Sequence, residues 1–226
     1  MKGPKYKVAD RRPIASRDTR GAQTIAKRLA AAGVAPNAIS VFGMVAAIGA
    51  GLLFGLTGEA EFGLRWLWLG GAALVQLRLL CNLFDGMVAV EREIASPLGE
   101  LYNEVPDRIS DVAVLIGVGY AAGGAPTLGC VAAMVALFVA YVRAMDKVAG
   151  APNDFCGPMA KAHRMAVVTV LGLYIAASPA TWRLDWGPGG AWAEAAVALW
   201  IIIAGGVLTA IRRLRRAGRA LREAPP

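Results

Sequence analysis

Residues 81–90 read CNLFDGMVAV, and residues 96–111 read SPLGELYNEVPDRISD. Both stretches carry carboxylates and carboxamides at helical spacing, and each adjoins a long apolar segment. The pattern predicts polar side chains where two helices meet one end of a membrane. Because ionisable groups beside a membrane span are costly, we interpret this cluster as the functional centre of the chain.

The composition predicts an all-α integral membrane protein. Of 226 residues, 57% are hydrophobic and 18% are charged, which is more apolar and less charged than a soluble domain of this length. Six nearly charge-free stretches are each close to the ~20 residues that a helix needs to cross a bilayer. The expected transmembrane helices are Ile39–Thr57, Phe62–Phe84, Asp107–Gly123, Thr127–Lys147, Ala160–Ser178 and Trp192–Ile211.

Basic residues indicate the orientation. They cluster in the first 28 residues, in the segment from Arg143 to Arg164, and after Ile211, whereas the opposite loops carry only Arg65 and Arg183. With six spans both termini lie on the same side, and the positive-inside rule makes that side cytoplasmic. We therefore expect both termini and the polar cluster to be cytoplasmic. The short chain with Arg-rich ends is typical of a bacterial protein, so we expect it in the inner membrane.

Three regions are expected along the chain. Residues 1–35 hold a basic arm and an amphipathic interfacial helix from about Ile14 to Ala32, with a polar linker helix as the alternative. Residues 36–212 form the six-helix domain, with Asn37 or Ser40 as the N-cap of its first helix. Residues 213–226 form a basic tail. The net charge of +8 sits beside the spans, which favours anionic lipid headgroups over nucleic acid as partners.

The polar cluster predicts a metal site. Asn82 and Asp85 share one helix face, and Asn103, Asp107 and Asp111 form a stripe on the next helix. Two antiparallel helices would aim these oxygens at one point, and such oxygens suit Mg²⁺ or Mn²⁺, which in turn hold phosphate. Glycine costs a helix roughly 1 kcal/mol relative to alanine. A ligand pressed against the backbone would explain Gly86 and Gly99, and close helix packing would also explain them.

The cluster resembles the signature of the CDP-alcohol phosphotransferases. That signature reads Asp-x-x-Asp-Gly-x-x-Ala-Arg, a short gap, then Gly-x-x-x-Asp-x-x-x-Asp. This chain supplies Asn82, Asp85, Gly86, Ala89 and Val90, then Gly99, Asn103 and Asp107. The tract from Ser96 to Leu101 is also similar to that of the choline/ethanolamine phosphotransferases within the family. The six-span topology extends the resemblance over most of the chain.

The resemblance implies a reaction and its residues. An acceptor hydroxyl attacks a CDP-alcohol, CDP-diacylglycerol being favoured here, and CMP leaves. In the family four acids hold two divalent metals, and the fourth acid is a candidate base. By position Asp107 becomes ligand or base, and Gly86, Ala89 and Gly99 leave room for the nucleotide. The metal ligands become Asn82, Asp85, Asn103 and Asp107. A homodimer is also implied.

Departures from the signature are as informative as the match. Two of the four acids are Asn, so the matched set carries two negative charges, and Val90 removes a cation. We expect a nearby acid to compensate, with Asp111 and Glu100 on the correct stripe and Glu91 and Glu104 rotated away from it. An inactive CDP-lipid or metal binder and an enzyme of the choline/ethanolamine type that uses diacylglycerol as acceptor remain alternatives.

Basic residues outside the signature complete the expected site. Lys161 and Arg164 are candidates for binding the diphosphate or the acceptor, although an ordinary positive-inside flank would look the same. His163 between them is expected to be solvated. Arg78 lies one turn before Asn82 within a span and should therefore pair with an acid. Asp146 is expected to be a solvated loop charge.

Overall fold

The computed structural model describes residues 15–58, 63–94, 96–152, 154–179, 182 and 193–223. The expected basic arm at 1–13, Arg183 and Trp192 lie outside these residues. Within them the regular elements are all helical: η1 (Ala15–Asp18), α1 (Arg20–Ala31), α2 (Pro36–Leu56), α3 (Leu64–Glu91), α4 (Pro97–Tyr120), α5 (Pro126–Val148), α6 (Lys161–Ala177) and α7 (Glu194–Glu223).

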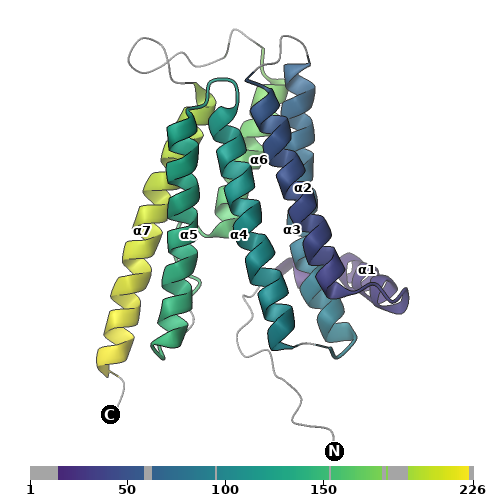
Figure 1. Cartoon of the computed structure of the whole chain (residues 1–226). Helices are drawn as coiled ribbons and strands as arrows, with labels where there is room; N and C mark the ends of the chain where they lie inside the picture. Colours follow the sequence, from purple (N-terminus) through teal and green to yellow (C-terminus); the bar gives the residue numbers. More distant parts are fainter. Residues whose placement is uncertain are drawn as a thin grey trace, which may run out of the picture.

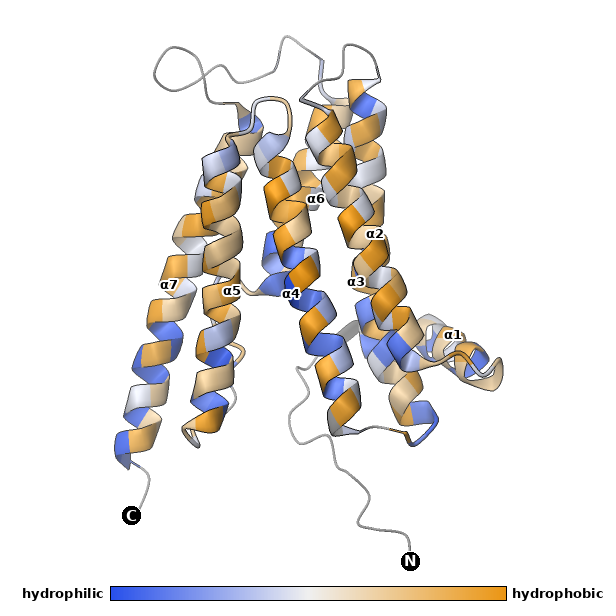
Figure 2. Cartoon of the chain, in the orientation of Figure 1, coloured by the Kyte–Doolittle hydropathy of each residue, from blue (hydrophilic) through white to orange (hydrophobic). Residues whose placement is uncertain are grey.

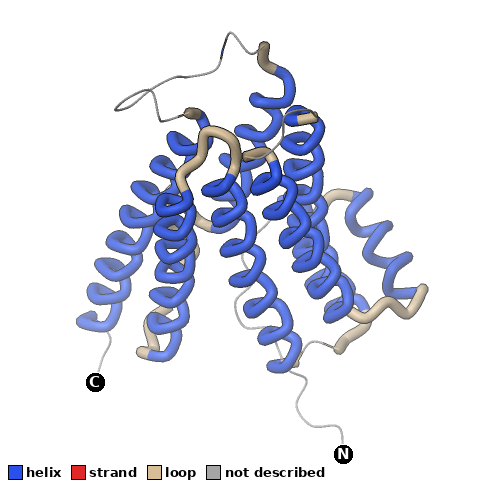
Figure 3. Tube along the Cα trace, turned by 45° about the horizontal axis from the view of Figure 1, so that its top comes forward, coloured by secondary structure: helices blue, strands red, loops and turns tan. Residues whose placement is uncertain are grey.

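The helices α2 to α7 run up and down alongside one another (Figures 1 and 3). Helix α2 packs against α3 and α4, α4 against α5, α5 against α7, and α3 against α6. Helix α6 begins well above the lower ends of its neighbours, and α1 lies across the lower part of the bundle, where it contacts α3 (Figure 1). Helix α6 therefore does not run beside the lower ends of α3, α4 and α5 (Figure 1).

Three helices begin with proline at their first position: α2, α4 and α5. This position needs no backbone N–H and suits the fixed φ of proline. Ser96 caps α4, because its hydroxyl accepts a hydrogen bond from the Gly99 N–H at 3.1 Å. The prediction that Asn37 or Ser40 is the N-cap of α2 is wrong. Ala35 is the N-cap, and Asn37 and Ser40 lie inside the helix, because Pro36 starts it earlier.

Glycines allow α2, α4 and α5 to approach closely. A Cβ on Gly117 of α4 would lie 2.2 Å from the carbonyl oxygen of Gly51 in α2. A Cβ on Gly119 would lie 2.8 Å from the Cα of Gly129 in α5. Small residues at such positions let helix backbones touch, so these glycines fix the spacing of the three helices.

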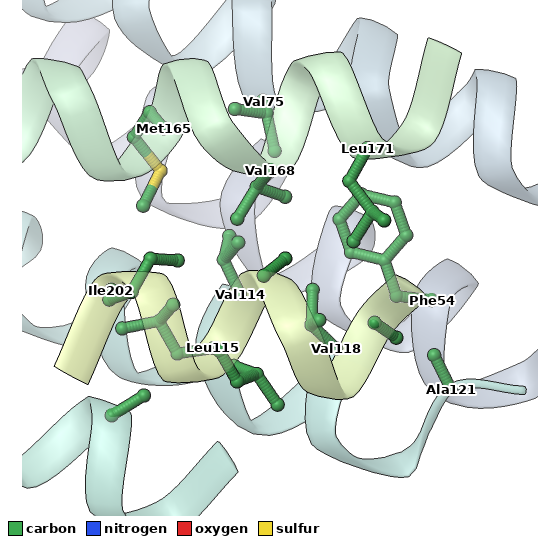
Figure 4. Packing of buried hydrophobic residues seen from close by; sticks show 14 of the residues in the cluster. Phe54, Val75, Val114, Leu115, Val118, Ala121, Met165, Val168, Leu171 and Ile202 are labelled. Atoms are coloured by element: carbon green, nitrogen blue, oxygen red, sulfur yellow. The ribbon is translucent and has the colours of Figure 1, made fainter. Parts of the chain in front are cut away.

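The core lies in the upper half of the bundle. Figure 4 shows Val114 and Leu115 near Val168 and Ile202, with Phe54 beside Leu171, and all of these side chains are buried. Large apolar side chains also point outward over much of the surface, among them Phe42, Leu52, Trp66, Phe138 and Val170. An apolar exterior of this extent is typical of a protein surrounded by lipid.

Four of the described helices, α2, α3, α5 and α7, are long and apolar enough to cross a membrane. Helix α4 carries charged residues in its first half, and α6 has 17 residues. The structure thus agrees with an all-α membrane protein, whereas six spans and an interfacial position for α1 stay predictions. Helix α7 also continues without a break from the expected domain into the expected tail as far as Glu223.

Candidate functional site

The polar cluster lies on two helices, as its spacing predicts, and both helices extend beyond the expected spans. The sequence predicts the end of the second span at Phe84 and the start of the third at Asp107, whereas α3 continues to Glu91 and α4 begins at Pro97. Polar residues gather in the lower halves of α3 and α4 and at the start of α6 (Figure 2). The signature therefore lies on two rigid helices with only a short connection between them.

A cavity of about 1140 Å³ opens among these helices. Nine of the ten predicted site residues line it: Asn82, Asp85, Gly86, Ala89, Gly99, Asn103, Asp107, Lys161 and Arg164. The tenth, Asp111, is fully buried and does not line the cavity. Asp85 and Asp107 lie close enough for their charges to interact. Helices α3, α4 and α6 thus bring the predicted residues together in one place.

Asp85 is fixed by two hydrogen bonds. The Ser40 hydroxyl of α2 donates to Oδ2 at 2.6 Å, and the Gly86 N–H donates to Oδ1 at 2.5 Å. The carboxylate is 3% exposed. Ser40 therefore positions the signature acid, a role that its expected place as a helix cap did not suggest.

Asp107 is surrounded by cations. Arg78 of α3 and Lys161 of α6 both contact its Oδ1, and Arg108 Nη2 lies 3.7 Å from Oδ2. The expectation that Arg78 pairs with an acid is thereby confirmed. One turn further, Asp111 accepts a hydrogen bond from Arg164 Nη2 at 2.6 Å. Basic side chains therefore already neutralise both acids at the centre of α4.

The amides are placed differently from these acids. Asn82 Oδ1 is buried and has no hydrogen-bond partner among the described residues. Asn103 is half-buried at the cavity wall. In the described part of the chain, His, Cys, Asp and Glu do not gather in groups of three that could hold a metal.

The two signature glycines face open space. A Cβ on Gly86 would meet no atom closer than Arg17 Nη2 at 4.0 Å, and a Cβ on Gly99 would meet only Ser96 Oγ at 3.4 Å. Neither glycine is needed for helices to approach, in contrast to Gly117. Of the two readings that the sequence left open, room for a ligand fits this geometry better than helix packing.

Several cavity residues were not among the predicted site residues. Arg17 reaches the cavity from η1, Arg143 from α5 and Arg213 from α7. Glu104, expected to point away, also lines the cavity, where Arg143 and Arg108 contact it. The sequence places Arg143 in a basic flank and Glu104 among the nearby acids, but their place in the cavity depends on how distant helices pack.

The environments of the remaining charged residues agree only in part with the predictions from the sequence. His163 is exposed, as expected, and does not line the cavity. Asp146 is not a solvated loop residue: it lies in α5 and is 4% exposed, where the charge of Arg213 on α7 acts on it. Burial acts to raise the pKa of Asp154 in the following loop. The hydrogen bonds from Cys156 and the charges of Arg216 and Arg213 outweigh burial and hold that pKa below its ordinary value.

Comparisons with known proteins identify the family of this chain. The profile of the CDP-alcohol phosphatidyltransferase family matches residues 33–211. The phosphatidylinositol phosphate synthase of Streptomyces avermitilis is 26% identical over 85% of this chain and 75% of its own length. That of Mycolicibacterium smegmatis is 28% identical over 89% of this chain and 83% of its own length.

A solved structure shares the fold. The Mycobacterium tuberculosis phosphatidylinositol phosphate synthase with CDP-DAG bound superposes with a TM-score of 0.69 at 21% identity, covering 88% of this chain and 94% of that one. The same protein has been solved in complex with manganese and citrate. Because the family profile spans most of the sequence, including the polar cluster, the chain belongs to the CDP-alcohol phosphatidyltransferase family.

Proposed function

We propose that this protein transfers the phosphatidyl group of CDP-diacylglycerol to the hydroxyl of an anionic alcohol and releases CMP. One observation carries the proposal: α3 and α4 present an acid each, together with two glycines that face open space, to a single cavity. That arrangement offers room for a nucleotide and groups to act on its phosphates. The solved relative with CDP-DAG bound supports the choice of donor.

The transfer step follows the usual course of phosphoryl transfer. The acceptor oxygen forms a bond to the phosphorus that carries diacylglycerol, and the bond from that phosphorus to the bridging oxygen breaks. CMP leaves with the bridging oxygen and its electron pair. Asp107 is the proposed general base that receives the hydroxyl proton at Oδ2, since it lines the cavity and Arg78 and Lys161 contact its other oxygen, Oδ1. The other aligned acid, Asp85, already accepts two hydrogen bonds.

Mg²⁺ or Mn²⁺ is the proposed cofactor. The buried Asn82 oxygen that lacks a hydrogen-bond partner among the described residues fits a cation ligand, and Asp85 and Asn103 line the same cavity. A divalent cation held by these three side chains would offset the charge of the pyrophosphate. Two residues predicted as metal ligands are left out of this set. Arg78 and Lys161 already contact Asp107, and Asp111 is buried against Arg164, which we propose it positions.

The charge of the cavity supports an anionic acceptor. Among the described residues, seven basic and four acidic side chains line it. The basic ones are Arg17, Arg108, Arg143, Lys147, Lys161, Arg164 and Arg213. Excess positive charge attracts phosphate-bearing ligands. The names of the relatives, phosphatidylinositol phosphate synthases, are consistent with a phosphate-bearing alcohol.

The proposed setting is a bacterial inner membrane, with the cavity on the cytoplasmic side. Arg212, Arg215 and Arg216 lie on α7 toward its C-terminal end. That end of α7 is at the same end of the bundle as the lower halves of α3 and α4 (Figure 1), and residues of these halves line the cavity. The positive-inside rule assigns this end to the cytoplasm. A homodimer is proposed on family resemblance alone.

CMP release tests the proposal. Purified protein receives CDP-diacylglycerol, Mg²⁺ or Mn²⁺, and one acceptor at a time: inositol phosphate, glycerol phosphate, inositol or serine. We expect CMP with a phosphate-bearing acceptor and none from Asp107→Asn. CMP from CDP-choline and diacylglycerol alone would instead identify the choline/ethanolamine type.

A CDP-lipid binder without turnover is the second candidate. It is favoured by the two amides in the signature and by the cations that already neutralise Asp107. Such a protein would bind CDP-diacylglycerol in the presence of Mn²⁺ and release no CMP with any acceptor. Binding measured beside the turnover assay separates the two functions.

A further inference from the structure

Arg78 is a buried cation that the transfer step does not use. Its side chain is 1% exposed and does not line the cavity. Arg78 Nε donates to Ser110 Oγ at 3.0 Å, Nη2 contacts Asp107 Oδ1, and the Ser110 hydroxyl donates to the Pro106 carbonyl at 2.6 Å. The guanidinium is therefore fixed between α3 and α4 directly behind the cavity.

Lys161 completes the arrangement from the cavity side. Its ammonium contacts the same Asp107 oxygen as Arg78, and the side chain is 14% exposed at the cavity wall. Asp107 thus has one cation behind it and one in front. A carboxylate contacted in this way offers little remaining charge to a metal ion.

Compared with the family signature, the site has two fewer carboxylates, and two cations contact one of the carboxylates that remain. Four signature carboxylates would balance two divalent cations, whereas this chain retains two carboxylates and has Asn82 and Asn103 in place of the others. The carboxylate of Asp107 is also neutralised by Arg78 and Lys161. A second divalent cation would therefore meet amides and fixed positive charge in a buried site, where uncompensated charge is costly. A single divalent cation bound at Asp85 would still have the carboxylate of that residue as a charged ligand.

We propose that the guanidinium of Arg78, together with the ammonium of Lys161, replaces one of the two divalent cations that the family signature is built to hold. This inference rests on the proposed function for the identity of the ligand. The protein then binds a single divalent cation per chain, and Lys161 provides the second positive charge that faces the pyrophosphate. Arg78 acts as a positioning residue, because it touches Asp107 and not the substrate.

The metal count tests this directly. Full-length protein is saturated with Mn²⁺ in the presence of CDP-diacylglycerol, freed of unbound metal, and analysed for manganese by mass spectrometry and electron paramagnetic resonance. We expect one Mn²⁺ per chain, with the spectrum of an isolated ion. Two ions per chain, a spin-coupled pair or no bound ion would each overturn the proposal.

Variants test the replacement itself. Combining Asn82→Asp and Asn103→Asp with Arg78→Leu should allow a second Mn²⁺ to bind. The same two acids with Arg78 retained, and the single variant Arg78→Lys, should remain at one. A triple variant that folds and still binds one ion would overturn the role of Arg78. If the triple variant does not fold, the double variant Asn82→Asp with Asn103→Asp decides: one Mn²⁺ per chain supports the role of Arg78, and two would overturn it.

The metal count does not depend on turnover. One Mn²⁺ per chain without CMP release would support the replacement and refute the proposed transferase. Two Mn²⁺ per chain with CMP release would do the opposite.

Discussion

Gly86→Ala should separate binding of a ligand from stability of the fold. The added Cβ would meet no protein atom closer than 4.0 Å, so the substitution creates no clash inside the molecule. Alanine is favoured over glycine in a helix interior by up to about 1 kcal/mol. We therefore expect the variant to unfold at the same or a higher temperature than the wild-type protein in detergent.

The same methyl group should damage catalysis. It would project into the cavity beside Asp85, where the proposed nucleotide lies against the backbone of α3. A displacement of about 1 Å from the productive position can cost on the order of 10²-fold in rate. We expect a loss of that order in kcat/KM for CDP-diacylglycerol, measured as CMP release over a range of donor concentrations.

A matched control separates the general effect of replacing a helical glycine by alanine from the effect of placing a methyl group in the cavity. Gly218 also lies inside a helix, α7, and a Cβ there would meet nothing within 4 Å. Gly218→Ala should raise stability by a similar amount and leave activity unchanged. Full activity in Gly86→Ala would refute the reasoning, because the open space at Gly86 would then not be ligand space. Clear destabilisation would refute the geometry on which it rests.

Three further outcomes are expected. Gly117→Ala should destabilise the protein by about 1–3 kcal/mol, since its Cβ would lie 2.2 Å from the Gly51 carbonyl oxygen and overpack α2 against α4; thermal unfolding in detergent measures this. Arg17→Gln should raise KM for CDP-diacylglycerol with little change in Tm, because Arg17 lines the cavity; an unchanged KM would exclude Arg17 from donor binding. Chelation with EDTA should abolish CMP release, and added Mg²⁺ or Mn²⁺ should restore it; activity that survives chelation would remove the metal from the proposal.

Arg78 shows how much of a contact the local sequence pattern can predict. Its position within an apolar span was enough to predict an acidic partner, because a charge there is too costly to remain alone. Which acid it meets could not be read from the sequence, since Asp107 lies on the next helix and the choice depends on the register between α3 and α4. The double contact of Asp107 with Arg78 and Lys161 changes the expected chemistry of that acid, and only the fold revealed it.

The sequence by itself determined the helices, their order and the residues that would gather, because apolar length and the 3.6-residue period act within one segment. Segments that run through Phe54, Leu115 and Ile202 needed only their own composition to be recognised. The tertiary structure decided which groups touch. It placed Ser40 on Asp85, buried Asp146, and brought Arg17 and Arg213 to the cavity from the two ends of the chain. Such contacts join distant residues and depend on helix spacing set by backbone contacts such as that of Gly51 with Gly117, which no local pattern encodes.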